Sequence, residues 1–155
     1  GKFWKQKGRK SVLFVVKGNA TLVDHAIGEA GAVDTAAVTL TTASGRICQI
    51  TNSRRASYGY DQRIEVHGQK GMLRADHMLE NTVELADAGG FRRAPAQHFF
   101  LERYEAAYRA EMAHFVAGVS RAGTILPDLD DGLRAQVLAD AATRSWQEGK
   151  AIRLD

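Results

Sequence analysis

The sequence predicts an α+β domain in which helices pack on one face of an open, mainly antiparallel sheet. Segments that alternate between apolar and polar residues occupy much of residues 10–87, and apolar residues at three-and-four spacing follow from residue 101. Short turns separate the alternating segments, whereas parallel strands need a crossover of about a dozen residues. The second face of the sheet carries threonines and mixed charges, so we expect it either to face water or to contact another subunit.

The first predicted strand covers residues 10–18, because β-branched and aromatic residues dominate "KSVLFVVKG" and Gly18 is expected to end it. Residues 34–53 predict a hairpin, with two alternating segments on either side of a turn at residues 43–45. One face of this hairpin is expected to pack on the core. Cys48 falls on that apolar face, which favours a buried and unreactive thiol.

Residues 61–76, "DQRIEVHGQKGMLRAD", predict a second hairpin that turns between Gly68 and Gly71. Residues 81–87 add a short strand, and these consecutive strands predict a meander. The stretch "ADAGGFRRAPAQH", residues 86–98, is rich in glycine and alanine. We expect it to be a loop that is either mobile or closes over the site of a neighbouring subunit.

Two helices complete the predicted fold. The first is amphipathic and runs from Leu101 to near Gly123. Pro127 separates it from a second helix, which Asp130 is expected to cap and which ends at Gly149. The final residues "AIRL" predict a closing strand.

The positive charge of the chain is concentrated at its start. Residues 1–10 hold five of the 21 basic residues and no acid, which leaves 16 positive against 18 negative charges elsewhere. We expect residues 1–10 to be a disordered or unrelated tail and residues 11–155 to form the domain. Nucleic-acid binding is therefore not expected, although a third and weaker hypothesis has this tail direct the domain to nucleic acid.

Cysteine content and hydropathy indicate the expected compartment. The chain has one cysteine, no apolar leader and no apolar run near the roughly 20 residues that a membrane helix needs. We expect a cytoplasmic protein that does not enter membranes.

Local motifs for catalysis and cofactor binding are absent from the sequence. It contains no G-x-G-x-x-G, G-x-x-x-x-G-K-[ST], H-E-x-x-H, C-x-x-C or G-x-S-x-G. We therefore assign no catalytic residue and no cofactor-binding residue. His67 and His77, with Asp76, lack a third ligand at a recognisable spacing, and the aspartates of "PDLDDG" suit a helix start, so no metal site is expected either.

The residues with the clearest binding chemistry are Tyr58 and Tyr60, on either side of Gly59. In an extended chain their side chains point to the same side, and two neutral phenols that both donate and accept hydrogen bonds can hold a vicinal polyol. The alternative is a pair of strand-edge tyrosines that contribute β-propensity and packing. The residues alone leave both interpretations open.

Most of the chain, roughly residues 22–154, resembles the C-terminal domain of inositol 2-dehydrogenases, in the glucose-fructose oxidoreductase-like (Gfo/Idh/MocA) family. The resemblance is most specific at residues 34–36, 52–55 and 58–61. It extends over "FFLERYEAAYRAEMAHFVAGV" and "DGLRAQVLADAATRSWQEGKAIRL". His25 stands where the family is expected to have proline, so the resemblance gives it no catalytic role.

The resemblance implies that an N-terminal Rossmann domain, absent from this chain, binds NAD(P) and supplies a catalytic lysine, which acts with an aspartate and a histidine near the domain junction, upstream of the residues present here. It also implies a homo-oligomer that forms through the open sheet face. The Tyr-x-Tyr stretch would reach a polyol such as myo-inositol, which is expected to bind weakly or only when a Rossmann domain is present. By position, Tyr58 and Tyr60 are the substrate-binding candidates, with Asp61, Arg54 and Arg55 as weaker neighbours.

Two functional hypotheses from different classes follow. In the first, the chain is the substrate-side and oligomerisation domain of an NAD-dependent inositol, or related polyol, 2-dehydrogenase, inactive without the cofactor domain. In the second, it is a non-catalytic assembly module of the same family, in which the tyrosines belong to an interface.

Overall fold

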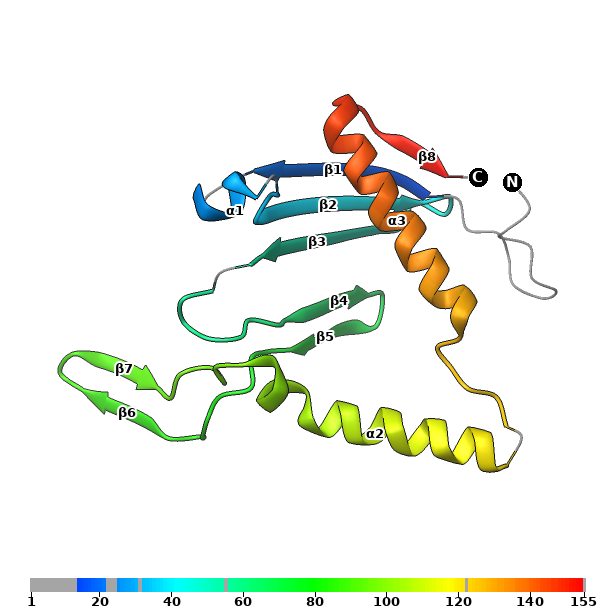
Figure 1. The fold of residues 1–155 in the computed structure, drawn as a ribbon. Coiled ribbons are helices and arrows are strands. Elements are labelled where there is room, and N and C mark those ends of the chain that lie inside the picture. The colour runs from blue at the N-terminus through cyan, green and yellow to red at the C-terminus, as the bar shows by residue number, and fades with distance from the viewer. Residues whose placement is uncertain (1–13, 22–24, 31, 55, 122, 155) are drawn as a thin grey trace. The chain divides into compact units, whose positions relative to one another are not determined.

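The computed structural model describes residues 14–21, 25–30, 32–54, 56–121 and 123–154. They fall into two compact units, which are best considered separately (Figure 1). The first unit combines Gly1–Arg55 with Pro127–Asp155, and the second is Ala56–Leu126. The predicted tail, residues 1–10, lies outside the described residues.

The first unit is a four-stranded antiparallel sheet with a helix against it. Its strands are β1 (Phe14–Thr21), β2 (Thr35–Thr42), β3 (Ile47–Ser53) and β8 (Ile152–Leu154), in the order β3-β2-β1-β8. Helix α3 (Leu129–Glu148) lies against one face of this sheet in Figure 1, and a short helix, α1 (His25–Glu29), follows β1. The predicted hairpin at residues 34–53, the closing strand and the α+β class are confirmed.

The core of the first unit forms where three strands and α3 meet. Val16 is fully buried, and its register partners are Leu40 on β2 and Ile152 on β8. Ala141 covers them from α3. Burial of each large aliphatic side chain stabilises the fold by about 1.5–3 kcal/mol.

Gly18 does not end its strand, as the sequence suggested, because β1 continues to Thr21. A Cβ at this position would lie 2.2 Å from the carbonyl oxygen of Ala142 on α3. The Gly18 N–H donates to the Ser145 hydroxyl at 3.0 Å, and Ser145 in turn donates to the carbonyl of Lys150 at 2.7 Å. Glycine is therefore required by the close approach of the helix and not by a turn.

Helix α3 has well-defined ends, although its N-cap differs from the prediction. Asp128, not Asp130, caps it: the Asp128 carboxylate accepts from the Asp131 N–H at 3.0 Å, and the Asp131 carboxylate accepts from the Asp128 N–H. Asp130 lies in the first turn. At the other end, Gly149 adopts a left-handed conformation with φ of +67°, as predicted.

Cys48 is exposed, so the expectation of a buried thiol is wrong. Its register partner is Leu40, which is buried. The difference arises because β3 is the edge strand of its sheet, and all seven of its residues are exposed.

The second unit contains two hairpins and a long helix. Strands β4 (Ile64–Gly68) and β5 (Gly71–Ala75) form the predicted second hairpin, and α2 (Phe100–Ser120) is the predicted first helix. These strands do not continue the first sheet as one meander, because each hairpin of this unit forms a separate two-stranded sheet. None of the helices among the described residues is long and apolar enough to span a membrane.

The stretch at residues 86–98 is not simply a loop, which corrects the prediction. Strands β6 (Glu84–Asp87) and β7 (Gly90–Arg93) pair around the turn residues Ala88 and Gly89, and Gly90, the first residue of β7, has a φ of +101°. Ion pairs Arg92–Asp87 and Arg93–Glu84 join the two strands. The glycines that suggested a flexible loop instead permit a tight turn.

Candidate functional site

The Tyr58-Gly59-Tyr60 segment is a turn and not an extended strand, so the premise that both phenols point to the same side is wrong. Gly59 has a φ of +121°, and its N–H donates to the Ala56 carbonyl at 3.3 Å. A Cβ on Gly59 would lie 2.8 Å from the Ala96 carbonyl oxygen. The sequence places glycine here because the backbone must turn against residue 96.

Tyr60 faces helix α2. Its ring meets that of Tyr104 edge-on, with centroids 5.5 Å apart, and its backbone N–H donates to the Gln97 carbonyl at 2.8 Å. Partial burial raises the pKa of Tyr104, and a hydrogen bond with the Tyr60 hydroxyl acts in the same direction. Tyr60 thus ties the turn to the helix.

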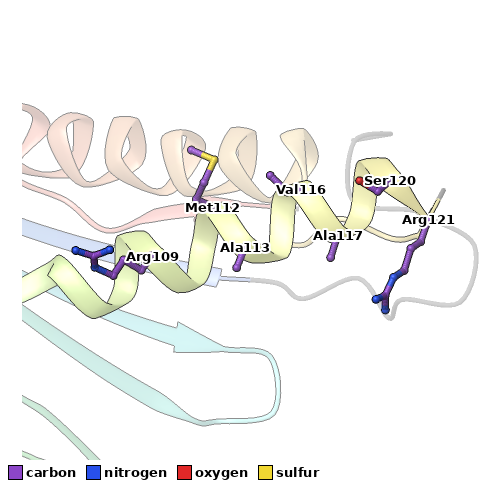
Figure 2. A pocket seen from close by; sticks show the side chains of 7 residues that line it. All are labelled: Arg109, Met112, Ala113, Val116, Ala117, Ser120 and Arg121. Carbon is purple, nitrogen blue, oxygen red and sulfur yellow. The ribbon is translucent and has the colours of Figure 1, made fainter.

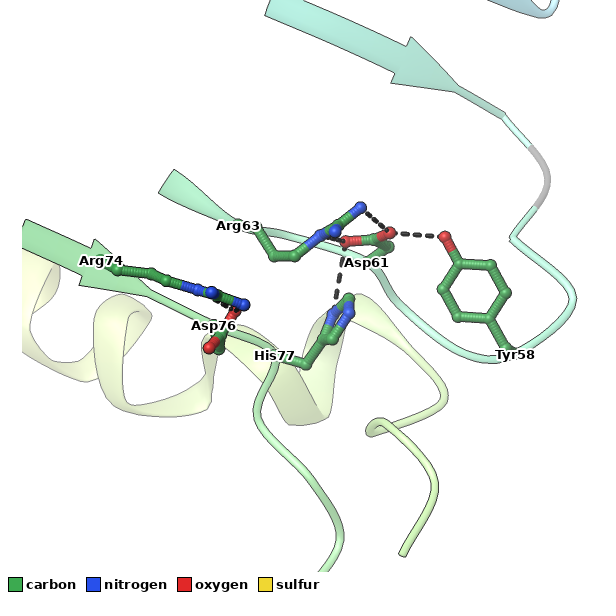
Figure 3. A network of polar contacts seen from close by, with 6 residues as sticks. All are labelled: Tyr58, Asp61, Arg63, Arg74, Asp76 and His77. Carbon is green, nitrogen blue, oxygen red and sulfur yellow. Dashed lines mark hydrogen bonds and ion pairs between the residues drawn. The ribbon is translucent and has the colours of Figure 1, made fainter. Parts of the chain in front are cut away.

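Tyr58 remains 58% exposed and joins a polar network (Figure 3). Its hydroxyl donates to Asp61 Oδ2 at 2.5 Å. Arg63 donates to both oxygens of the same carboxylate, from Nε to Oδ1 at 2.9 Å and from a terminal nitrogen to Oδ2 at 3.0 Å. The result is an accessible phenol whose orientation a bidentate ion pair supports.

His77 is a member of this network that sequence reasoning missed. Its Nδ1 lies 3.3 Å from Asp61 Oδ1, close enough for an ion pair but without hydrogen-bond alignment, and its ring meets the Tyr58 ring edge-on at 6.3 Å. The β4–β5 register pairs Ile64 with Ala75. Continuing that register beyond the hairpin brings residue 61 near residue 77, and this was the available signal.

The network favours an ionised Asp61. Burial opposes ionisation, but hydrogen bonds from Tyr58 and Arg63 and the charges of His77 and Arg63 outweigh it and hold the pKa of Asp61 below its usual value. The hydrogen bond to Asp61, with smaller contributions from burial and from the Asp61 charge, raises the pKa of the Tyr58 phenol against the opposing effect of Arg63. At neutral pH, Tyr58 is therefore a neutral phenol beside a carboxylate.

The other two predicted neighbours are not part of this network as described. Arg54 belongs to the first unit, where its backbone N–H donates to the Asp34 carbonyl at 2.8 Å. Arg55 lies outside the described residues. Of the five predicted residues, the structure joins Tyr58 and Asp61 directly and directs Tyr60 toward a different neighbour, Tyr104.

The two histidines that were considered as metal ligands, His67 and His77, contact different carboxylates. His67 Nε2 is 2.7 Å from Glu65 Oε1, whereas His77 lies on Asp61. Among the residues that the structure describes, no group of three or more His, Cys, Asp or Glu side chains could hold a metal ion.

Comparison with known proteins identifies the family. Residues 8–154 match the family described as "Oxidoreductase family, C-terminal alpha/beta domain". The chain belongs to this family. The predicted resemblance is thereby confirmed, and the match begins within the basic segment.

The relatives of this oxidoreductase domain include inositol dehydrogenases. An inositol 2-dehydrogenase of Rhizobium meliloti is 47% identical over 87% of this chain and 41% of its own length. A myo-inositol 2-dehydrogenase of Thermotoga maritima is 45% identical over 88% of this chain and 41% of its own length. The crystal structure of a myo-inositol dehydrogenase from Corynebacterium glutamicum superposes with a TM-score of 0.87 at 39% identity, over 92% of this chain and 44% of that one. The chain thus spans about two fifths of the length of these curated relatives.

A nicotinamide dinucleotide, which the family resemblance implies, does not fit the described residues of this oxidoreductase domain. Its pyrophosphate needs free N–H groups at a helix N-terminus after a glycine-rich turn. The start of α3 is occupied by the carboxylates of Asp128 and Asp131. Near the start of α2, the Glu102 carboxylate accepts from the His98 N–H at 3.1 Å. The starts of the two long helices, α2 and α3, therefore both present negative charge.

A shallow hollow lies along the C-terminal half of α2 (Figure 2). Residues of this one helix, including Met112 and Val116, line it together with Arg121, which directly follows the helix. The Tyr58 network contributes nothing to it, and its lining contains no acid–base pair. The hollow is an exposed apolar face of the oxidoreductase domain and not a second candidate for chemistry.

Proposed function

We propose that this chain is the substrate-side domain of an NAD-dependent inositol, or related polyol, 2-dehydrogenase, and that Tyr58 contacts the polyol. The observation that carries the proposal is the exposed Tyr58 hydroxyl held by Asp61 and Arg63. Relatives at 47% and 45% identity are named as inositol 2-dehydrogenases. Hydride transfer and the cofactor are assigned to a separate domain, so this chain binds and orients the substrate.

The charge balance of the network suits a neutral polyol. The negative charge of Asp61 is matched by Arg63, which bonds to both of its oxygens. The exposed group beside this pair is an uncharged phenol, which offers one oxygen for hydrogen bonding and a ring face for C–H packing. An anionic or cationic substrate would find no unmatched charge on these three residues.

A chimeric enzyme tests the proposal. Residues 8–154, the range that matches the family, would replace the corresponding domain of the Rhizobium meliloti inositol 2-dehydrogenase, and NAD reduction by myo-inositol would be measured. We expect activity, and we expect Tyr58→Phe to lower kcat/KM about ten- to a hundredfold through loss of one hydrogen bond to substrate. Tyr108→Phe, on the exposed part of α2, is the matched control and should change nothing. Unchanged kinetics in Tyr58→Phe would remove Tyr58 from the site.

Binding by the chain itself gives an independent check. Saturation-transfer NMR would be recorded on the 155-residue chain with myo-inositol and with NAD separately. We expect contact with inositol that weakens in Tyr58→Phe, and none with NAD. NAD binding would contradict the assignment of the cofactor to another domain.

An assembly role is the second candidate, and the β4–β5 hairpin favours it. Ile64, Val66 and Leu73 lie on one face of this hairpin and are 57%, 54% and 77% exposed. We propose that such apolar sheet surfaces mediate a homo-oligomer, whether or not the chain binds a polyol. Light scattering should then show an oligomer in wild type and a shift toward monomer in Val66→Lys. An oligomer that myo-inositol does not affect, in a chain that shows no NMR contact with inositol, would favour assembly as the only role.

A further inference from the structure

We propose that Asp61 and Arg63 are positioning residues that make the Tyr58 hydroxyl an acceptor, and not a donor, of the hydrogen bond to a substrate hydroxyl. This inference rests on the proposed function and deepens it. It concerns which atom supplies the proton, and therefore which polyols the site accepts.

The direction of the Tyr58–Asp61 hydrogen bond follows from the chemistry of the two groups. An ionised carboxylate only accepts, so the proton between Tyr58 Oη and Asp61 Oδ2, which are 2.5 Å apart, belongs to the phenol. A phenol has one proton. Once it is directed to Asp61, the remaining lone pairs of the exposed oxygen can only accept.

Arg63 holds the carboxylate in this role. It donates to both Asp61 oxygens, which fixes the carboxylate plane and keeps Oδ2 aimed at Tyr58. The Asp61 side chain is 16% exposed, against 57% for Arg63, so the carboxylate is largely shielded from competing water. His77 approaches the other oxygen, Oδ1, and leaves the Tyr58 side unchanged.

The consequence is a site that requires an O–H group at one position of the polyol. A substrate in which that hydroxyl is replaced by hydrogen or fluorine cannot donate and should lose the contact equally in both cases. A tyrosine that donated its own proton would distinguish the two analogues, since fluorine retains a weak acceptor. Equal loss of binding for the two analogues indicates that Asp61 makes Tyr58 an acceptor, whereas tighter binding of the fluoro analogue indicates that Tyr58 donates.

The first experiment needs no substrate and uses the 155-residue chain with tyrosine labelled with carbon-13 at Cζ. Loss of one resonance in Tyr58→Phe assigns Tyr58. We expect its titration to lie above the usual tyrosine pKa of about 10 and to move down in Asp61→Asn. Asp76→Asn is the matched control, because Asp76 pairs with Arg74, and it should leave the Tyr58 titration in place. Unchanged chemical shifts of the Tyr60 and Tyr104 resonances show that the variants are folded. If the pKa of Tyr58 is the same in Asp61→Asn as in wild type, the positioning role of Asp61 is overturned.

The second experiment compares myo-inositol with its monodeoxy and monodeoxy-monofluoro analogues at each ring position, by saturation-transfer NMR on the same chain. At one position, both analogues should bind about tenfold or more weakly in wild type, the loss of about one hydrogen bond. In Asp61→Asn the amide can donate to Tyr58 and free its proton, so the fluoro analogue should recover relative to the deoxy analogue. A wild-type chain that binds the fluoro analogue as well as myo-inositol overturns the proposal. A Tyr58 titration that responds to Asp61→Asn in a chain that binds no inositol overturns the proposed function instead.

Discussion

Tyr60 and Tyr104 meet edge-on with ring centroids 5.5 Å apart, which links the turn around Gly59 to helix α2. The neighbouring Tyr58 takes the opposite role, since it remains exposed and bonds to Asp61. The two tyrosines that the sequence presents as a pair are thus one structural anchor and one accessible phenol.

The anchor role of Tyr60 predicts a stability effect. Tyr60→Ala should lower the free energy of unfolding by about 1–3 kcal/mol, because the aromatic contact with Tyr104 and the partial burial are lost. Tyr60→Phe keeps the ring and should cost less than about 1 kcal/mol. Urea unfolding of both variants measures the difference. If the two variants were equally destabilised, the hydroxyl and not the ring would be the anchor.

Gly59 should tolerate substitution less well than another glycine with positive φ. In Gly59→Ala the new Cβ meets the Ala96 carbonyl at 2.8 Å, whereas Gly90→Ala places its Cβ in open space. Both variants carry backbone strain of about 1–3 kcal/mol, so the excess in Gly59→Ala measures the clash. Thermal unfolding compares them, and an equal loss of Tm would show that residue 96 moves away at little cost.

The pKa of Asp61 predicts a specific response to acid. Because the pKa is lower in the folded chain, Asp61 contributes stability that is present above the unfolded value of about 3.9 and is lost as pH falls through the folded value. Asp61→Asn should therefore narrow the difference in Tm between pH 7 and about pH 3. Asp76→Asn is the control for this change in Tm, because Asp76 forms a comparable ion pair with Arg74 that is exposed to solvent. An acid response that Asp61→Asn leaves unchanged would contradict the stabilising contacts assigned to the carboxylate.

Alanine substitutions at two glycines of the first unit, Gly18 and Gly132, are predicted to change the stability of the chain in opposite directions. Gly18→Ala would place a Cβ 2.2 Å from the Ala142 carbonyl, so α3 must shift, and overpacking of this kind costs about 1–3 kcal/mol or more. Gly132→Ala, in the first half of α3 with open space around its Cβ, should instead stabilise the chain by about 0.5–1 kcal/mol. Chemical denaturation of both variants tests the signs. A neutral Gly18→Ala would mean that the helix is not held close to β1.

Local patterns in the sequence predicted most of the regular elements, though not α1 or β7. Alternation located the β2–β3 and β4–β5 hairpins, and the three-and-four spacing located α2. The strand at residues 81–87 was predicted, but its pairing with β7 was missed because the glycines were taken as a sign of flexibility, although Ala88 and Gly89 form the turn and Gly90, directly after them, has the positive φ. The glycines were correctly noted in the sequence, but their ability to form a tight turn between two strands was not recognised.

The candidate site could be predicted only in part because its geometry depends on contacts distant in sequence. Gly59 turns against Ala96, and Tyr60 rests on Tyr104, so no local alternation could place these side chains. Tyr58 was singled out by its residue type and then supported by the family resemblance, which alone added Asp61. Their connection to His77 depends on the strand register of the β4–β5 hairpin.

Cys48 offers a probe of both the fold and its assembly. The thiol is exposed on the edge strand β3, so a disulfide reagent such as dithionitrobenzoate should titrate one thiol per chain without denaturant. Dilution distinguishes the two ways in which the thiol could be protected. Protection that disappears on dilution would show that a second copy covers β3, because an oligomer dissociates as concentration falls. Protection that persists in a monomer would contradict the exposed position of Cys48 and would place another part of the same chain over this strand.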